Sequence, residues 1–197
     1  MGKVIAIDGP SGAGKSTVSK LIAERLGFKF LDTGALYRAA AIHLKRKGLK
    51  EDSSDKEIAT ALKGVKIAFK DGKVFLKDAS RSFEEDVSET IRTTEAGHYA
   101  SVFSARKPVR EFLLAAQRNA AKHGDIVAEG RDMTTVVFPD AWKKFYIDAS
   151  EEGRAKRRYL QLKEKGMTIT IEEALSDVRE RDIRDSNRDI APLRRAD

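Results

Sequence analysis

Eight consecutive residues, Gly9 to Ser16, have the residue types and spacing of a phosphate-binding loop. They read Gly-Pro-Ser-Gly-Ala-Gly-Lys-Ser and match the pattern G-x-x-x-x-G-K-S/T at every fixed position. Glycines lack a Cβ, which lets consecutive backbone N–H groups approach phosphate oxygens closely. Lys15 can bring a positive charge to the outer phosphates, and the Ser16 hydroxyl can ligate the Mg²⁺ that accompanies them. The loop therefore predicts a nucleoside triphosphate site.

The segments on either side of this loop fit a strand and a helix. Residues 3–8 are mostly apolar and rich in β-branched residues, as in a buried strand of a parallel sheet. After the loop, apolar residues recur at helical spacing, namely Val18, Leu21, Ile22 and Leu26. A helix that begins near Gly14 would add its positive N-terminal end to the phosphate site. The alternative is a glycine-rich turn with a chance lysine, and the flanking elements argue against it.

The composition limits the class of protein. A chain of 197 residues with 41% hydrophobic content predicts one domain of ordinary size. The net charge of +7 favours anionic partners, which include both nucleotides and nucleic acids. The absence of cysteine excludes disulfides, thiolate metal sites and a cysteine nucleophile, and the three histidines are too far apart to suggest a zinc site. No apolar run approaches the length of a membrane span and the first strand starts at the N-terminus, so we expect a soluble, cytoplasmic protein.

A second strand over residues 28–32 ends at Asp32, and a helix follows it. We expect this strand to lie next to the first one, at the edge where doubly wound sheets bind ligands, so Asp32 could hold a Mg²⁺-bound water. Asp32 or Thr33 could equally be the N-cap of the helix. Arg38, one turn later, is either a surface charge or a phosphate contact, and its spacing alone favours the surface.

The middle of the chain contains a hairpin pattern. Residues 65–70 and 73–77 alternate apolar and polar side chains around the pair Asp71-Gly72, which predicts a β-hairpin. An antiparallel hairpin does not belong in a parallel sheet, so we expect an insertion. A small helix is predicted over 53–64, and short helical pieces over 84–104.

Two later strands and a helix complete the core. Pro108 opens a helix that carries Arg110 in its first turn. The strand over 125–128 is followed directly by Glu129-Gly130-Arg131-Asp132, which is either a charged loop or a ligand site at the carboxyl edge of the sheet. Its position favours the ligand site. A further strand is predicted over 144–148.

The last third of the chain is basic and helical. Arg154, Arg157 and Arg158 share one face of a helix that Ser150 begins, and Thr170 and Glu173 form a plausible capping box for the next helix. On that second helix, charged residues repeat at i, i+3, i+4 and i+7, namely Arg181, Arg184, Asp185 and Arg188. The simpler interpretation is a solvated face with Glu–Arg pairs such as Glu180–Arg184. Arginines on rigid faces also suit bidentate contacts with phosphate, which the triphosphate site needs.

Taken together, these motifs resemble those of the bacterial cytidylate kinases. The matching segments are residues 7–16, 32–38, 130–132 with 136–139, and 181–188 followed by 191–193. The likeness covers nearly the whole chain. It implies an α/β fold of the P-loop nucleoside monophosphate kinase type, with a parallel sheet flanked by helices. Residues 1–197 would form one domain, with a core of 1–34, 105–149 and 167–197, a nucleoside-monophosphate-binding insertion at about 35–104, and a helical lid at about 150–166.

The resemblance also implies an activity and its residues. The γ-phosphoryl group of Mg-ATP would pass to CMP or dCMP, giving CDP or dCDP and ADP. Mg²⁺ would bind Ser16, with Asp32 reached through water. ATP would be bound by Gly9, Pro10, Ser11, Gly12, Ala13, Gly14, Lys15, Ser16 and Thr17. CMP would be bound by Thr33, Arg38, Ser101, Arg110, Arg131, Asp132, Arg181, Asp185 and Arg188. The catalytic groups would be Lys15, Arg131, Arg157 and Arg188, and Arg154 or Arg158 would move with the lid.

Within that set, the resemblance gives separate roles to separate groups. Arg38, Arg131 and Arg188 would hold the acceptor phosphate, and Asp185 the ribose hydroxyls. At the base, Asp132 would accept from the cytosine amine while Arg110 and Ser101 donate to the ring. Uracil reverses two of those three hydrogen-bond positions and would leave buried groups unpaired, at about 1–3 kcal/mol each.

Two departures and three alternatives remain with this interpretation. The family continues through another strand and a C-terminal helix, which the 197-residue sequence lacks, and it carries a charged helix former where this chain has Gly153. The alternatives are a kinase for UMP, AMP or a small metabolite, an NTP-hydrolysing regulatory switch, and a nucleic-acid-binding protein. Against the last, the arginines are spread over separate elements without interleaved aromatic residues. We therefore expect a monomer with no nucleic-acid or membrane partner.

Overall fold

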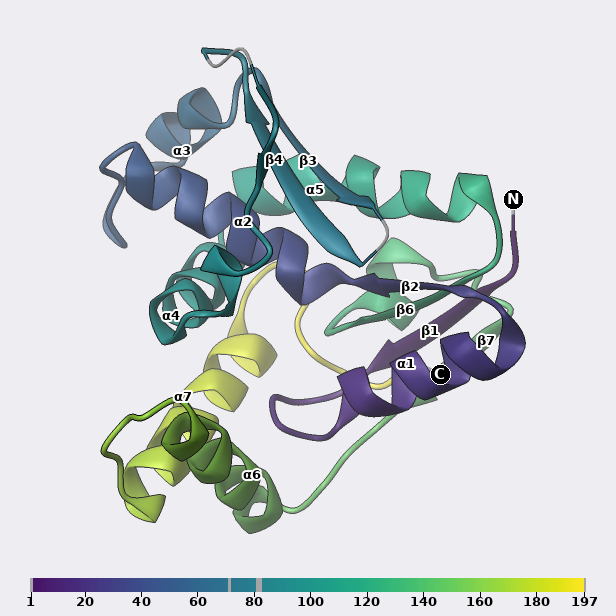
Figure 1. Cartoon of the computed structure of the whole chain (residues 1–197), viewed down its shortest axis with the longest axis vertical. Coiled ribbons are helices and arrows are strands. Elements are labelled where there is room, and N and C mark those ends of the chain that lie inside the picture. The colour runs from purple at the N-terminus through teal and green to yellow at the C-terminus, as the bar shows by residue number, and fades with distance from the viewer. Residues whose placement is uncertain (1, 71, 81–82, 197) are drawn as a thin grey trace.

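Two separate β-sheets organise the protein (Figure 1), whose computed structural model describes residues 2–70, 72–80 and 83–196. One sheet is parallel, with the strand order β2-β6-β1-β7, and the other is antiparallel, with the order β3-β4-β5. The parallel strands are β1 (Val4–Asp8), β2 (Lys29–Asp32), β6 (Ile126–Gly130) and β7 (Lys143–Tyr146). The expected α/β class with an antiparallel insertion is confirmed.

The order of the parallel strands differs from our expectation. We expected β2 to lie beside β1, but β6 lies between them and pairs with both. Every residue of β1 and β6 is buried, so these two strands take central places while the more polar β2 takes an edge. The register pairs Asp8 with Gly130 and Asp32 with Glu129, which brings the carboxyl ends of three strands together.

Helix α1 (Lys15–Leu26) follows the phosphate-binding loop, but of the four apolar residues that we expected on its inner face only Ile22 packs against the sheet. The exposed fractions are 38% for Val18, 49% for Leu21 and 50% for Leu26. Ser19 and Ala23 are buried instead, and Ala23 and Ile22 pack against apolar residues of β1 and β6. Small side chains at the contact let the helix approach the strands closely, and the larger ones are turned away from the sheet.

The predicted insertion begins with helix α2 (Thr33–Arg46) and contains the second sheet. Its elements are α3 (Asp55–Ala61), β3 (Val65–Lys70), β4 (Lys73–Asp78), β5 (Glu85–Asp86), the 3-10 turn η1 (Thr90–Arg92) and α4 (Thr94–Phe103). The small helix and the hairpin are confirmed, and Gly72 has the positive φ of 77° that such a turn needs. Asp71, the other residue of that turn, lies outside the described residues.

The segment 84–104 is more regular than we predicted. Besides one short helical piece, η1, it forms β5, which pairs with β4, and a ten-residue helix, α4. The Thr93 hydroxyl accepts a hydrogen bond of 3.1 Å from the Ala96 N–H and so caps the start of α4. Phe103, at the end of this helix, is fully buried and belongs to the same hydrophobic core as residues of α2 and of both sheets.

Three longer helices come from the second half of the chain. They are α5 (Lys107–Ala120), α6 (Glu151–Glu164) and α7 (Ile171–Asn187), and a short 3-10 turn, η2 (Ala121–His123), follows α5. Pro108 lies in the first turn of α5, Ser150 caps α6 and the Thr170–Glu173 capping box is present, as predicted. The strand that we expected over 144–148 is shifted to Lys143–Tyr146.

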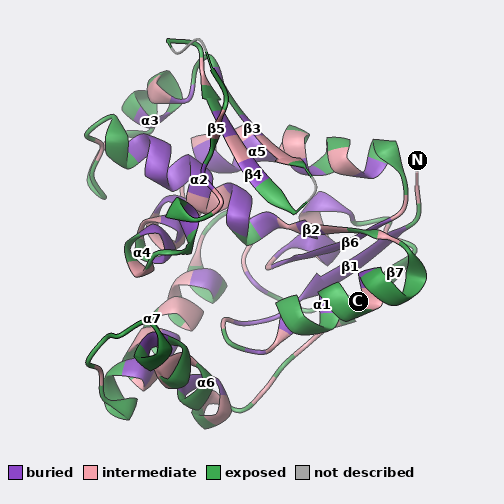
Figure 2. Ribbon diagram, viewed as in Figure 1, coloured by how far each residue is buried: buried purple, intermediate pink, exposed green. Residues whose placement is uncertain are grey.

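Helices α6 and α7 lie side by side at the end of the molecule away from the hairpin (Figure 1). They are much more exposed than the sheet strands β1 and β6 and helix α2, which carry the core (Figure 2). In the described residues, no helix has the length and apolar character needed to cross a membrane.

Asp8, at the end of β1, fixes the turn that follows β6. Its carboxylate is fully buried and accepts hydrogen bonds from the Met133 N–H (2.8 Å), the Thr134 N–H (2.7 Å) and the Thr134 hydroxyl (2.6 Å). These donors lie in the π-helical turn η3 (Met133–Val137), directly after Asp132. Burial raises the pKa of Asp8, and the three donors oppose that rise by stabilising the charged form.

We expect Thr134→Val to destabilise the protein by about 1–3 kcal/mol, because it removes one donor from a buried carboxylate. The neighbouring Thr135→Val is a matched control, since the Thr135 hydroxyl oxygen is buried without a hydrogen-bond partner among the described residues. Urea unfolding of both variants measures the difference. Equal losses in the two variants would show that the bond from Thr134 to Asp8 contributes nothing.

Candidate active site

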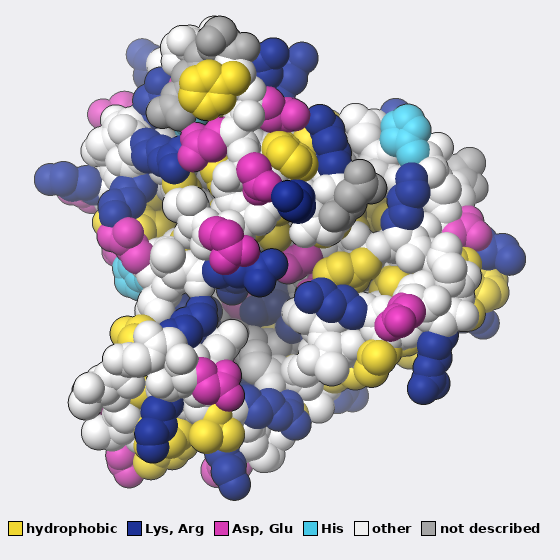
Figure 3. All heavy atoms as spheres, viewed as in Figure 1, with side chains coloured by type: hydrophobic (Ala, Val, Ile, Leu, Met, Phe, Trp, Pro, Cys, Tyr) yellow, Lys and Arg dark blue, Asp and Glu magenta, His cyan; other side chains and the backbone are white. Residues whose placement is uncertain are grey.

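A polar cavity of about 300 Å³ lies where the carboxyl ends of β2 and β6 meet the phosphate-binding loop, α4, α5 and α7. On the surface, Lys and Arg side chains border a hollow at the centre of the face shown in Figure 3. The expected site residues that line the cavity are Ser11, Lys15, Ser16, Asp32, Thr33, Arg38, Ser101, Arg110, Arg131, Asp132, Arg181, Asp185 and Arg188. Those that do not are Gly9, Pro10, Gly12, Ala13, Gly14, Thr17 and Arg157.

The phosphate-binding loop has the backbone shape that its glycines predict. Gly9, Gly12 and Gly14 have φ values of 149°, 75° and 95°, a region that favours glycine. A Cβ on Gly9 would lie 1.9 Å from the Ile147 carbonyl oxygen, so the chain leaving β7 leaves no room for a side chain there. Gly14 is the N-cap of α1, which places the positive end of that helix at the loop.

Lys15 is the buried cation of this loop. Its Nζ donates hydrogen bonds of 2.7 Å to the carbonyl oxygens of Gly9 and Pro10. Burial lowers the pKa of the ammonium to about 7, and the positive charge of Arg131 adds to this effect. A bound anion would therefore stabilise the charged form of Lys15 and raise its pKa again.

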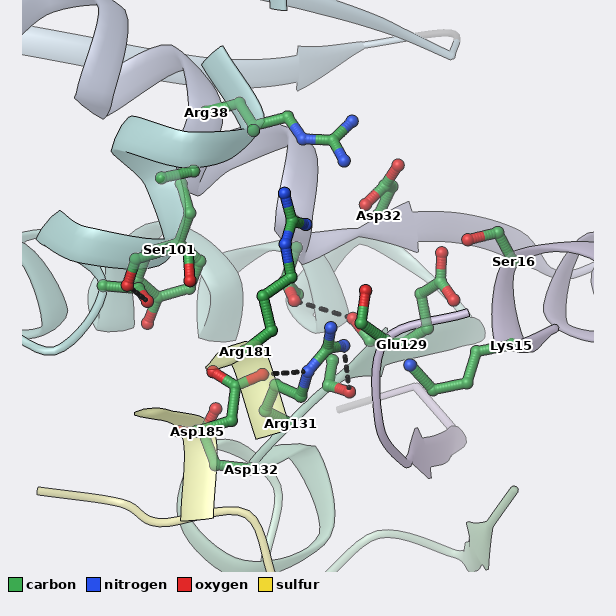
Figure 4. Close-up of a pocket in the computed structure, with 18 of the residues that line it drawn as sticks. Lys15, Ser16, Asp32, Arg38, Ser101, Glu129, Arg131, Asp132, Arg181 and Asp185 are labelled. Carbon is green, nitrogen blue, oxygen red and sulfur yellow. Dashed lines mark hydrogen bonds and ion pairs between the residues drawn. The ribbon is translucent and has the colours of Figure 1, made fainter. Parts of the chain in front are cut away.

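The carboxylate of Glu129 lies beside Ser16, although the sequence analysis gave this residue no individual role. Glu129 is 4% exposed, and its Oε2 has no hydrogen-bond partner in the described part of the chain. Burial raises its pKa and the nearby Asp32 charge adds to the rise, while the Ser16 hydroxyl and Lys15 oppose it. Figure 4 shows Ser16, Asp32 and Glu129 facing the same space. In the sequence, the position of Glu129 at the end of a buried strand was the feature that could have indicated a role for this residue.

Asp32 serves as the helix N-cap. Its Oδ1 accepts a hydrogen bond of 3.0 Å from the Ala35 N–H at the start of α2. Of the two candidates that the sequence left open, Asp32 is the cap and Thr33 is not. The Thr33 hydroxyl instead donates to the Glu129 carbonyl oxygen at 2.6 Å, which ties α2 to the end of β6.

Arg131 and Arg188 project into the cavity beside Asp185. Arg131 Nε donates to Asp185 at 2.7 Å (Figure 4). Burial opposes ionisation of Asp185, but Arg131 and Arg188 outweigh it and lower the pKa of that carboxyl. Arg188 has 4% of its side chain exposed and donates through Nε to the Ala191 carbonyl, while its Nη2 makes no hydrogen bond among the described residues. The Nη2 nitrogen of Arg188 is thus left for a ligand.

Asp132 and Arg110, which both line the cavity, form a buried ion pair. Arg110 also donates to the Ser104 carbonyl at 3.0 Å and lies over the Tyr37 ring, 5.6 Å from its centre. The Asp132 Oδ2 takes the ion pair, and its Oδ1 lies 3.8 Å from Arg188 Nη2. Because Arg110 is held on three sides, this pair presents a fixed donor and a fixed acceptor.

Arg38 of α2 and two further arginines of α7 differ in their surroundings. Arg38 lines the cavity, so the surface position that its spacing favoured is wrong, and burial lowers its pKa. Arg181 donates to Asp177 at 3.1 Å. Arg184 donates to the Ser101 hydroxyl oxygen at 2.6 Å, in place of the surface pair with Glu180.

The arginines of α6 are not free for a ligand in this arrangement. Arg157 donates to the Gly12 carbonyl at 3.0 Å and Arg158 to Asp177 at 2.7 Å. Arg154 is buried and donates to the Ser11 carbonyl at 3.2 Å. The three share one helix face, as their spacing predicts, and each donates to another part of the protein, Arg154 from a buried position and Arg157 from an exposed one.

Comparison with known proteins places this chain in a family. The sequence model of the family "Cytidylate kinase" matches residues 5–197. The protein named cytidylate kinase in Thermodesulfovibrio yellowstonii is 57% identical over 98% of this chain and 86% of its own length. Those of Thermosipho melanesiensis and Geobacter sulfurreducens are 49% and 46% identical, over 98% and 100% of this chain and 84% and 83% of their own lengths.

The chain belongs to the cytidylate kinase family. This agrees with the resemblance seen in its motifs, and it makes the chain a nucleotide-binding transferase. The cavity suits such a cytidylate kinase because it gathers cations in one space beside the phosphate-binding loop. Charge neutralisation and alignment are what phosphoryl transfer between two nucleotides requires.

We expect binding of ATP to this cytidylate kinase to take up about one proton at pH 8, because Lys15 is then mostly neutral and regains its proton beside the phosphates. At pH 6 the lysine is already charged, so the uptake should vanish. Titration calorimetry in two buffers of different ionisation enthalpy measures it. Identical heats in both buffers at pH 8 would contradict the lowered pKa of Lys15.

Proposed function

We propose that the protein transfers the γ-phosphoryl group of Mg-ATP to CMP or dCMP, forming CDP or dCDP and ADP. The observation that carries this is the cavity itself, because the phosphate-binding loop and the Asp132–Arg110 pair open into the same space. One group of residues suits a triphosphate and the other suits a base with a donor and an acceptor. Membership of the cytidylate kinase family supports cytosine as that base.

The reaction would need no covalent help from the protein. The acceptor phosphate is largely ionised near neutral pH, so one of its oxygens can attack the γ-phosphorus in line with the departing ADP oxygen. Lys15 and the loop amides would hold the donor, while Arg38, Arg131 and Arg188 would hold the acceptor phosphate. These groups neutralise the charge of two anions that would otherwise repel each other.

The acceptor nucleoside would lie along α7 and the end of β6. Asp185, charged because Arg131 lowers its pKa against the effect of burial, can accept hydrogen bonds from the ribose hydroxyls. The Asp132 Oδ1 can accept from the cytosine amine, since Oδ2 is taken by Arg110. Ser101 and Arg110 would donate to the ring, and Arg181 lies beside them in the cavity.

The residues around Ser16 fit a magnesium ion that arrives with ATP. Glu129 has a buried carboxylate oxygen without a partner, and the Ser16 hydroxyl lies beside it. No group of three or more His, Cys, Asp or Glu in the described residues could hold a metal ion by itself. This fits Mg²⁺, which keeps water and phosphate oxygens as ligands. Ser16 and Glu129 would hold it, with Asp32 reached through water, and the ion would neutralise charge on the transferred phosphoryl group.

The wider organisation follows from these roles. We propose that the insertion at about 35–104 binds the acceptor and that α6, within about 150–166, acts as a lid that excludes water. Because one chain supplies both parts of the cavity, we propose that it works as a monomer. Its nucleotide substrates are those of the cytoplasm, which suggests that location. The arginines that line the cavity face inward, which argues against a nucleic-acid partner.

The direct test is ADP formation from Mg-ATP with CMP, dCMP, UMP or AMP, and with no acceptor. We expect turnover to be strongest with CMP and dCMP. Strongest turnover with UMP or AMP would keep the kinase and overturn the base assignment. Turnover that is independent of any acceptor would indicate an NTP hydrolase.

We expect Asp132→Asn to narrow the preference for CMP over UMP by about 10–100-fold, because an amide can turn a donor towards the carbonyl of uracil. The ratio of kcat/KM for the two nucleotides measures this. Asp140→Asn, at an exposed position after the turn η3, is the control. A preference that stays at the value of the unmodified protein would remove Asp132 from the base site.

We expect Glu129→Gln to lower kcat by about 10–100-fold and to raise the Mg²⁺ concentration needed for half activity, because a charged ligand of the metal is lost. The fold should not lose stability, since burial already disfavours the Glu129 charge. Asp32→Asn is the comparison. A larger loss of metal response in Asp32→Asn would reverse the two roles.

We expect Gly153→Ala to lower kcat by up to about fivefold, because alanine stabilises the first turn of α6 by up to about 1 kcal/mol and slows opening of the lid. The gain is limited because the new Cβ would lie 3.1 Å from the Ser150 Oγ that caps this helix. Steady-state kcat and the rate of product release measure it. Lys156→Ala, exposed on the same helix, is the control. Unchanged turnover in Gly153→Ala would count against a lid that limits the rate.

A further inference from the structure

Cations hold four consecutive carbonyl groups of the phosphate-binding loop. Lys15 donates to Gly9 and Pro10, as described above, Arg154 donates to Ser11 at 3.2 Å, and Arg157 donates to Gly12 at 3.0 Å. These contacts fix the orientation of the loop carbonyls, and the N–H groups of the loop stay available for a phosphate. When Lys15 turns to a bound nucleotide, the two arginines of α6 are the cations that remain on the carbonyls.

Arg154 is built into the protein in a way that Arg157 is not. Arg157 is exposed, whereas Arg154 is 6% exposed and also donates through Nε to the Ala149 carbonyl at 3.1 Å. A Cβ on Gly12 would lie 3.2 Å from the Arg154 Cβ and 3.3 Å from its carbonyl oxygen. The first turn of α6 therefore lies directly against the loop, and it can do so because residue 12 is a glycine.

The same guanidinium reaches the acceptor side of the cavity. Arg154 Nη1 lies 2.6 Å from Asp182 Oδ2. Asp182 belongs to α7, between Arg181 and Asp185, which both line the cavity. A single buried side chain thus links the Ser11 carbonyl of the donor loop to the helix that carries acceptor-binding residues.

We propose that Arg154 is a positioning residue that fixes the phosphate-binding loop to α7 and so couples donor binding to acceptor binding. It does not move onto the phosphates with the lid. The coupling rests on the proposed function, whereas the effect on the loop does not. Binding of either nucleotide would order the loop, Arg154 and α7 together, so the second nucleotide would bind more tightly than the first.

The first test compares ADP with ATP on Arg154→Met by calorimetry. We expect both affinities to fall by the same factor, about tenfold, because the loop amides hold phosphates that the two nucleotides share and one charged hydrogen bond is lost. A fall for ATP with no change for ADP would show that Arg154 contacts the γ-phosphate and would overturn the proposal. No change for either nucleotide would also overturn it.

The second test uses the partner of Arg154. Asp182→Asn should weaken ATP and ADP binding in the same direction as Arg154→Met, because the guanidinium loses its anchor. If Arg154 were instead a phosphate ligand, release from Asp182 would tighten ATP binding. Arg154→Lys should recover part of the affinity, and it also serves if Arg154→Met does not fold. Affinity in Arg154→Lys as low as in Arg154→Met would contradict a role for the charge.

A matched control comes from the same pair of helices. Arg179 of α7 and Glu151 of α6 form an ion pair of 2.8 Å with 56% and 33% of their side chains exposed, and within the described part of the chain neither residue forms a hydrogen bond or ion pair with the loop. Arg179→Met should leave both nucleotide affinities unchanged. An equal loss in this variant would mean that general attachment of α6 to α7 is responsible, and it would overturn the specific role of Arg154.

The coupling itself is measured with both substrates present. We expect CMP to tighten binding of ADP to the unmodified protein, and this gain to disappear in Arg154→Met. If CMP does not bind at all, the proposed function fails while the ADP and ATP comparison still tests the position of Arg154. A gain that persists in the variant would overturn the coupling.

Discussion

Positive charge is concentrated in the cavity, and the positions of the other groups in the site depend on these cations. In the described part of the chain, one ammonium and five guanidinium groups line the same space. Burial, together with repulsion from neighbouring cations, lowers the pKa values of Lys15, Arg38 and Arg188. A highly charged anion relieves this repulsion, so the site favours phosphate over a neutral ligand.

Carboxylates hold the cations in place without cancelling them. Asp185 pairs with Arg131 and Asp132 with Arg110, each at a position where the arginine keeps other N–H groups for a ligand. Removing one member of such a buried pair leaves an uncompensated charge, which costs about 3–5 kcal/mol. The residues proposed to bind substrate are therefore also residues on which the fold depends, and removing any of these side chains would affect both properties.

Much of this arrangement could be predicted from the sequence, and the exceptions have a common cause. The loop from Gly9 to Ser16, the hairpin and the caps of α6 and α7 are encoded by local spacing. The place of β6 between β1 and β2 depends on which strands can be buried on both sides, which only the assembled sheet decides. The same holds for Arg154, whose helical position is apparent from spacing but whose partners Ser11 and Asp182 are far away in sequence. Glu129 was visible as a charge after a strand, but its orphaned oxygen beside Ser16 could not be seen.

The end of β6 fixes the distances between three parts of the proposed substrate site. Glu129, Arg131 and Asp132 lie within four consecutive residues and face the metal, the acceptor phosphate and the base in the proposed arrangement. Hydrogen bonding to β1 and β2 on one side, and the hold of Asp8 on the turn after Asp132 on the other, leave this segment no freedom to lengthen. The span from metal to base is therefore set by backbone geometry. A change of acceptor would have to come from substitutions in the surrounding helices, because an insertion or deletion here would separate all three contacts at once.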